Sequence, residues 1–124
     1  MDKVIIAGKE FHTLVAMTEE EQVQGLMWKP WPPPIMAFPF DSMEKRSFWM
    51  KNTISPLDII FCQAGKIIGI YSGEPFSKDF LGPNEPSDLV IEFPAGTAKA
   101  NNFSIGDSVK LSLGISSLAR KFTA

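Results

Sequence analysis

Five side chains have the types that bind or transform a small molecule: Trp49, Lys51, Asn52, Asp58 and Glu92. An indole offers a large apolar face with one N–H donor. A lysine ammonium offers a positive charge with three donors. Two carboxylates that share a site push their pKa values apart and can supply an acid and a base. The chemistry of this chain therefore depends on whether the fold brings these five groups together.

The spacing of Trp49 and Lys51 predicts that both lie on one face of a strand. Residues 46–51 form a short run rich in aromatic residues, in which Met50 would point to the core and its two neighbours would point away. An indole beside an ammonium suits an anionic or carbonyl-bearing ligand. Alternatively, Lys51 lays its methylene stem over Trp49 and points its ammonium to water. Asn52 follows directly, either as part of a groove or as a turn cap.

The two acids, Asp58 and Glu92, lie in the apolar runs LDIIF and VIEFPAG, which predict buried strands. Each buried carboxylate needs a partner, because an unpaired buried charge is costly. For Asp58, the structural interpretation is an ion pair with Lys51 across a hairpin, and the functional one is a general base or a ligand acceptor. If the strand of Glu92 neighbours either group, the two acids and the lysine would share one patch.

The elements that position these residues predict a mainly β protein. An N-terminal hairpin is expected over residues 4–15, and a capping box of Thr18 and Glu21 predicts one short helix over residues 19–28, which the following prolines end. Further strands are predicted at residues 35–40, 46–51, 57–62, 66–71, 89–93 and 109–114. The expected fold is a compact antiparallel β-sandwich or barrel-like domain with one short α-helix packed on it.

Two further segments complete the expected organisation. Residues 72–87 form a polar, Gly/Pro-rich stretch, which predicts a long loop that covers the groove. Residues 115–124 show no clear period and predict a C-terminal tail, so that residues 1–114 form a single β-rich domain.

Composition excludes several classes of function. The 124 residues carry a net charge of −2 with acids and bases intermixed, which gives no electrostatic footprint for nucleic acid. No apolar stretch is long enough to span a membrane, and the N-terminus lacks a signal-peptide core, which indicates a cytoplasmic protein. The single histidine, His12, and the single cysteine, Cys62, give no metal-ligand spacing, and no cofactor motif is present. Cys62 is expected to be a small buried hydrophobe.

Several blocks of the chain together resemble the DUF192 family of small bacterial and archaeal domains of unknown function. The blocks are TEEEQVQGLMW, SFWMKNTISPLDIIF, KIIGI, VIEFPAG and IGD, in that order along about residues 10–111. The resemblance implies a compact antiparallel β-fold with one packed helix, and it implies no reaction, substrate or cofactor. One departure is PPPIMAF at residues 32–38, where the family tends to have a strand that starts with glycine.

We expect a non-enzymatic binding module that takes a small polar molecule or an extended peptide segment into a groove with Trp49, Lys51, Asn52, Asp58 and Glu92. The alternative is a hydrolase- or lyase-type enzyme that uses Asp58 or Glu92 as general base, with Lys51 stabilising negative charge. A further alternative is a structural or interaction protein.

Overall fold

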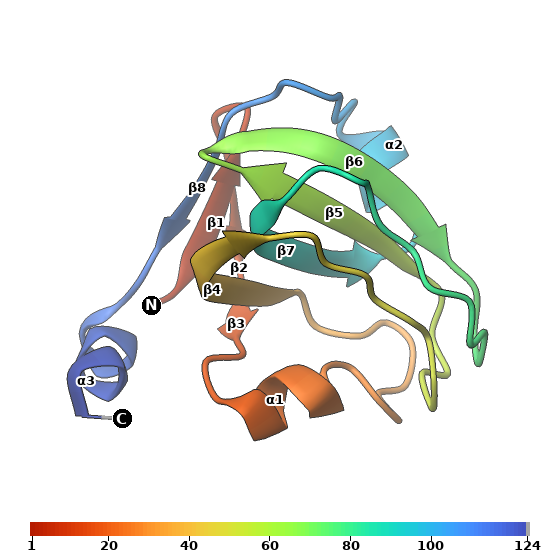
Figure 1. Ribbon diagram of the computed structural model, residues 1–124, viewed down its shortest axis with the longest axis horizontal. Coiled ribbons are helices and arrows are strands. Elements are labelled where there is room, and N and C mark those ends of the chain that lie inside the picture. Colours follow the sequence, from red (N-terminus) through yellow and green to blue (C-terminus); the bar gives the residue numbers. More distant parts are fainter. Residues whose placement is uncertain (124) are drawn as a thin grey trace.

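The computed structural model describes residues 1–123 and confirms a mainly β protein (Figure 1). Within these residues, one sheet has the strand order β2-β1-β8 and the other has the order β3-β4-β7-β5-β6, and the sheets do not close into a barrel. The paired strands are antiparallel, except that β3 and β4 are parallel. The strands are β1 (Lys3–Ile6), β2 (Lys9–His12), β3 (Leu14–Val15), β4 (Met36–Glu44), β5 (Leu57–Gln63), β6 (Lys66–Gly73), β7 (Ser87–Pro94) and β8 (Val109–Ser112).

Two hydrophobic cores lie on opposite faces of the five-stranded sheet. The first, which we call the inter-sheet core, joins that sheet to β1 and includes Val4, Ile60 and Phe93. The second, which we call the helix-side core, includes Phe38 and Ile59. Because side chains alternate along a strand, each central strand supplies both cores. This double burial explains why β5 is an almost uninterrupted apolar run.

The N-terminal hairpin expected from the sequence is confirmed, and both it and the hairpin of β5 and β6 turn through residues with positive φ. Ala7 and Gly8 join β1 to β2 with φ of 49° and 83°, and Ala64 and Gly65 join β5 to β6 with φ of 47° and 80°. Two consecutive left-handed residues match the twist of antiparallel strands. Cys62, in β5, is fully buried as expected, and burial raises the pKa of its thiol to about 12.

Three short helices are present among the described residues, where one was expected: α1 (Glu19–Gln24), α2 (Thr97–Ala100) and α3 (Ile115–Thr123). Helix α1 begins at the predicted capping box. The Thr18 hydroxyl accepts a hydrogen bond from the Glu21 N–H, and the Glu21 carboxylate accepts one from the Thr18 N–H. Helix α1 ends at Gly25, earlier than predicted. No helix in the described part of the chain is long and apolar enough to cross a membrane.

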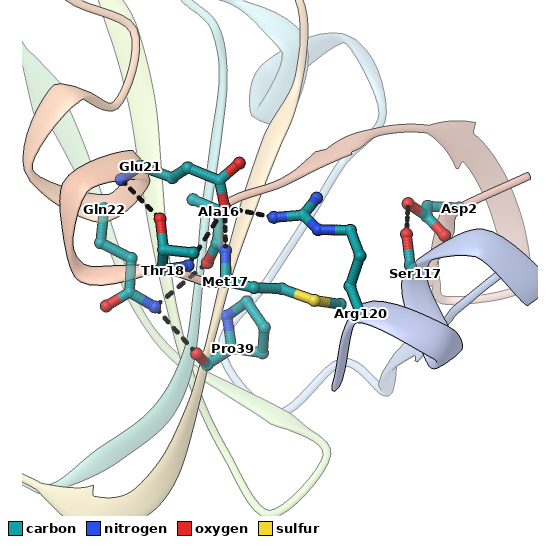
Figure 2. A network of polar contacts seen from close by, with 9 residues as sticks. All are labelled: Asp2, Ala16, Met17, Thr18, Glu21, Gln22, Pro39, Ser117 and Arg120. Atoms are coloured by element: carbon teal, nitrogen blue, oxygen red, sulfur yellow. Dashed lines mark hydrogen bonds and ion pairs between the residues drawn. The ribbon is translucent and has the colours of Figure 1, made fainter. Parts of the chain in front are cut away.

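Helix α3 lies where the sequence predicted a C-terminal tail. Side chains join it to Asp2 near the N-terminus and to Glu21 of α1 (Figure 2). The Asp2 carboxylate accepts hydrogen bonds from the Gly114 N–H and the Ser117 hydroxyl. Arg120 donates to Glu21 of α1 over 2.6 Å. The Arg120–Glu21 pair is largely exposed, and such pairs contribute up to about 1 kcal/mol.

The prediction of a strand at residues 46–51 is wrong. This segment is extended, but it makes only an isolated bridge, in which Phe48 and Leu81 exchange two backbone hydrogen bonds of 2.8 Å. A third bond joins the Met50 N–H to the Ser77 carbonyl. The segment therefore pairs with the loop at residues 74–86 instead of with a strand of the sheet.

Candidate functional site

A pocket of about 570 Å³ lies on the helix-side face of the five-stranded sheet. Helix α1 and the residues just after it line one side, and the extended segment of residues 47–53 lines the other. The floor includes Phe38 from β4 and Glu92 from β7, which are the two neighbouring strands at the middle of the sheet. The site is thus built from three parts of the chain that are distant in sequence.

Four of the five predicted site residues line this pocket: Trp49, Lys51, Asn52 and Glu92. The Trp49 side chain is 38% exposed, and the Lys51 Nζ lies 5.2 Å from the centroid of its ring. This distance allows a cation–π contact. Lys51 is also exposed, so its ammonium lies near the indole and remains accessible to water.

The loop at residues 74–86 supports Trp49 from outside the pocket. The ring of Phe80 stacks on Trp49 with a centroid separation of 5.4 Å and an interplanar angle of 10°. None of the residues that line the pocket comes from this loop. The expectation that residues 72–87 cover the groove is therefore wrong, because this loop pairs with the outer side of the segment and α1 occupies the face above the sheet.

Asn52 lies in a turn and also lines the pocket, so both predictions made for it from the sequence apply. It has a left-handed φ of 57°, as expected for a residue in a tight turn. Its carbonyl oxygen accepts a hydrogen bond of 2.9 Å from the Trp28 N–H, just beyond α1. This bond joins the two walls of the pocket at one end.

Glu92 is the buried acid of the pocket. It is only 5% exposed, and it forms no hydrogen bond or ion pair with any residue in the described part of the chain. Burial raises the pKa of its carboxyl group to about 8, so the neutral acid predominates at pH 7. A Cβ atom on Gly25 would lie 3.7 Å from the Glu92 Oε1, which places the carboxyl group close to the end of α1.

Asp58 does not belong with the other four residues, which corrects the predicted grouping. It points into the inter-sheet core with Ile60, whereas Glu92 points to the opposite face with Val90. The Asp58 Oδ2 accepts hydrogen bonds of 3.1 Å from the Gly96 N–H and 2.9 Å from the Ala98 N–H. The expected ion pair between Asp58 and Lys51 is not formed, because main-chain donors of α2 satisfy this carboxylate.

Sequence reasoning missed the contribution of α1 to the site. The helix buries none of its own side chains, so its polar surface faces the pocket and solvent. Gln22, one of the lining residues, donates hydrogen bonds of 3.1 Å to the carbonyl oxygens of Ala16 and Pro39. These bonds, drawn in Figure 2, join α1 to the residue just after β3 and to β4. The capping box predicted where α1 starts, but the sequence of the helix does not indicate which face of the sheet it covers.

Within residues 1–123, no three His, Cys, Asp or Glu side chains are grouped so that they could hold a metal ion. The polar side chains that line the pocket are side-chain amides, two hydroxyl groups, one ammonium and two carboxyl groups.

The DUF192 family, described as "Uncharacterized ACR", matches this chain over residues 3–111. The chain belongs to the DUF192 family. The resemblance noted in the sequence is thereby confirmed, and so is the small β-rich fold that it implied. No curated protein matches the chain.

Two crystal structures resemble this DUF192 protein over most of its length. A protein of unknown function from Novosphingobium aromaticivorans DSM 12444 has a TM-score of 0.79 and 29% sequence identity, and the match covers 87% of this chain and 83% of that chain. A candidate transcription regulator from Sinorhizobium meliloti 1021 also has a TM-score of 0.79, with 31% identity, and the match covers 89% of this chain and 91% of that chain.

Proposed function

We propose that this DUF192 protein is a non-enzymatic binding module for a small polar molecule that enters the pocket between α1 and residues 47–53. Glu92 carries the proposal, because it is a buried carboxyl group that has no partner among the described residues and lines the same pocket as Trp49 and Lys51. Buried polar groups in proteins almost always have a hydrogen-bond partner, and leaving one unsatisfied costs about 1–3 kcal/mol. A ligand that bonds to Glu92 would give this carboxyl group the partner that the described residues do not supply.

The position of the pocket favours a small molecule over an extended peptide segment. A peptide that binds as an added strand needs a free sheet edge. Here β4 and β7 line the floor, and β7 is paired on both sides, with β4 and with β5. A concave pocket on a sheet face, with aromatic side chains and a few polar groups, is the usual form of a small-molecule site.

The description of the Sinorhizobium relative as a candidate transcription regulator concerns that protein. The net charge of −2 and the intermixed acids and bases give no electrostatic support for carrying nucleic-acid binding over to this chain.

A thermal-shift screen of small polar metabolites, together with mass spectrometry of gently purified protein, tests the proposal. We expect a ligand that raises the melting temperature of the wild type by several degrees, and at least tenfold weaker binding by Trp49→Ala and Glu92→Gln. Trp31→Ala is the matched control, because Trp31 is 56% exposed and does not line the pocket. Unchanged binding in both pocket variants would refute the proposal.

Acid–base catalysis in the same pocket is the second candidate function. The observation that favours it is the carboxyl pKa of about 8 at Glu92, because a general acid or base works best when its pKa lies near the working pH. Lys51 would stabilise developing negative charge. Conversion of a bound ligand by the wild type, and binding without conversion by Glu92→Gln, would favour the enzyme over the binding module.

A further inference from the structure

We infer that the ligand of this pocket is a small zwitterion of the amino-acid type, whose protonated amine contacts Glu92 and whose carboxylate contacts Lys51. The inference rests on the proposed binding function and deepens it by naming the class of ligand. Its basis is that Glu92 and Lys51 line one pocket, and that neither side chain forms a hydrogen bond or an ion pair with any residue in the described part of the chain.

The floor lacks a donor for its carboxyl group. Glu92 accepts no hydrogen bond from any residue in the described part of the chain, and no lysine or arginine lies within ion-pair distance of it. The adjacent positions on the neighbouring strands, Met36 and Ile59, are apolar. Once ionised, this carboxyl group would need donors and a compensating charge, and a protonated amine brings three N–H groups and a positive charge.

The mouth lacks an acceptor for its ammonium group. Lys51 is exposed, and within residues 1–123 its Nζ makes no hydrogen bond or ion pair, its neighbour being the Trp49 ring. Lys51 and Glu92 line one pocket without forming a salt bridge to each other. A ligand with a positive group deep in the pocket and a negative group near the surface would satisfy both residues. A simple cation or a simple anion would satisfy only one.

Aromatic rings between these two ends suit the rest of such a ligand. Phe38, Phe48 and Trp49 all line the pocket. Their ring faces attract a cationic group, and their apolar surface accommodates an aliphatic or aromatic side chain. The volume of about 570 Å³ lies within the range of small-ligand pockets.

Binding of an amine should also release a proton. In the free protein, burial holds the pKa of Glu92 near 8, so the carboxyl group is mostly neutral at pH 7. A bound ammonium favours the ionised carboxylate and lowers this pKa, which expels up to about one proton per ligand at pH 7. The other ionisable side chains that line the pocket are Glu19 of α1 and Lys51, and both are exposed.

The test uses calorimetric titration of the full-length protein with L-amino acids, and compares L-phenylalanine with 2-phenylethylamine and 3-phenylpropanoate, which each lack one charged group. The same pairs are made for leucine. We expect at least one amino acid to bind at least tenfold more tightly than either of its analogues. Titrations at pH 7 in phosphate and in Tris should show a net release of protons, up to about one per ligand.

Two variants assign the two ends of the ligand. Glu92→Gln should abolish proton release and the preference over the analogue without the amine. Lys51→Gln should abolish the preference over the analogue without the carboxylate. Lys78→Gln is the matched control, since Lys78 is an exposed lysine of the loop at residues 74–86 and does not line the pocket.

A second panel of sugars and organic acids without an amine separates failure of this inference from failure of the proposed function. If one of these compounds binds and Glu92→Gln or Trp49→Ala weakens its binding while no amino acid binds, the zwitterion is refuted and the binding function stands. If the amine-free analogue binds as well as the amino acid, the role of Glu92 is refuted. If neither panel binds, both proposals are refuted.

Discussion

Asp58 and Glu92 are both buried carboxyl groups on adjacent strands of one sheet, yet their surroundings are opposite. Asp58 is 8% exposed and Glu92 is 5% exposed. Asp58 accepts two main-chain hydrogen bonds from Gly96 and Ala98, whereas Glu92 has no partner among the described residues. Burial alone therefore does not distinguish a structural acid from a candidate functional one. The supply of donors does.

The two helices that cover the sheet explain this difference. Asp58 meets the N-terminal end of α2, where free N–H groups point outward and negative charge is favoured. Glu92 lies close to Gly25 at the C-terminal end of α1, where a helix presents carbonyl oxygens and disfavours a negative charge. On one face of the sheet the acid thus has its donors, and on the other face the acid has none among the described residues.

The largest expected difference between the two acids is the dependence of protein stability on pH that Glu92 causes. The pKa of Glu92 is about 8 in the folded protein, against 4.5 for an ordinary glutamate. Between these values the folded state keeps a proton that the unfolded chain has lost. The protonated Glu92 therefore makes its full contribution to the free energy of unfolding below pH 4.5. This contribution decreases as the pH rises to 8, with a slope of up to about 1.4 kcal/mol per pH unit.

Urea unfolding of the wild type and of Glu92→Gln at pH 5, 6, 7 and 8 measures this contribution. Since the glutamine cannot ionise, the variant should gain stability relative to the wild type as the pH rises. A difference between the two proteins that stays constant over this range would contradict the raised pKa.

Removal of the satisfied acid should have the next largest effect. Asp58→Ala leaves the N–H groups of Gly96 and Ala98 without their acceptor, and we expect a loss of about 2–4 kcal/mol in the free energy of unfolding. Asp58→Asn keeps one acceptor oxygen and should lose less. Urea midpoints with an unchanged m-value measure both losses. Glu92→Gln at pH 5 is the control, and an equal loss there would break the distinction between the two acids.

Two buried serines test the same rule with the smallest effects. The Ser55 hydroxyl donates to the Lys29 carbonyl oxygen over 2.8 Å, whereas the buried Ser87 hydroxyl has no partner among the described residues. Ser55→Ala should cost about 1–2 kcal/mol, and Ser87→Ala should change stability by less than about 0.5 kcal/mol. Thermal unfolding of the two variants side by side measures the difference. A larger loss of stability in Ser87→Ala than in Ser55→Ala would mean that the hydrogen bond of the hydroxyl group does not determine the effect of these substitutions.

The sequence predicted well those features that depend on neighbouring residues. The capping box of Thr18 and Glu21 located the start of α1, because both partners lie within one helical turn. The alternation in residues 46–51 also predicted burial correctly, with Met50 fully buried and Trp49 partly exposed, although the segment is not a strand. An extended chain alternates its side chains whether it pairs with a sheet or with a loop.

The sequence did not predict which acid accompanies Trp49 and Lys51. The strands β5 and β7 are buried on both faces, so their apolar runs do not reveal which core each side chain faces. The register that pairs Ile59 with Glu92 and Asp58 with Phe93 makes this decision.

By itself, the sequence determined a mainly β protein with defined hairpins, a capped helix and polar groups inserted into apolar runs, because periodicity, turn residues and capping act over a few positions. Only the tertiary structure decided that α1 covers one sheet face, that α2 supplies donors on the other, and that Glu92 shares a pocket with Trp49, Lys51 and Asn52. Those outcomes depend on strand register and on which helix end meets each carboxyl group, and both join residues that are far apart in the chain.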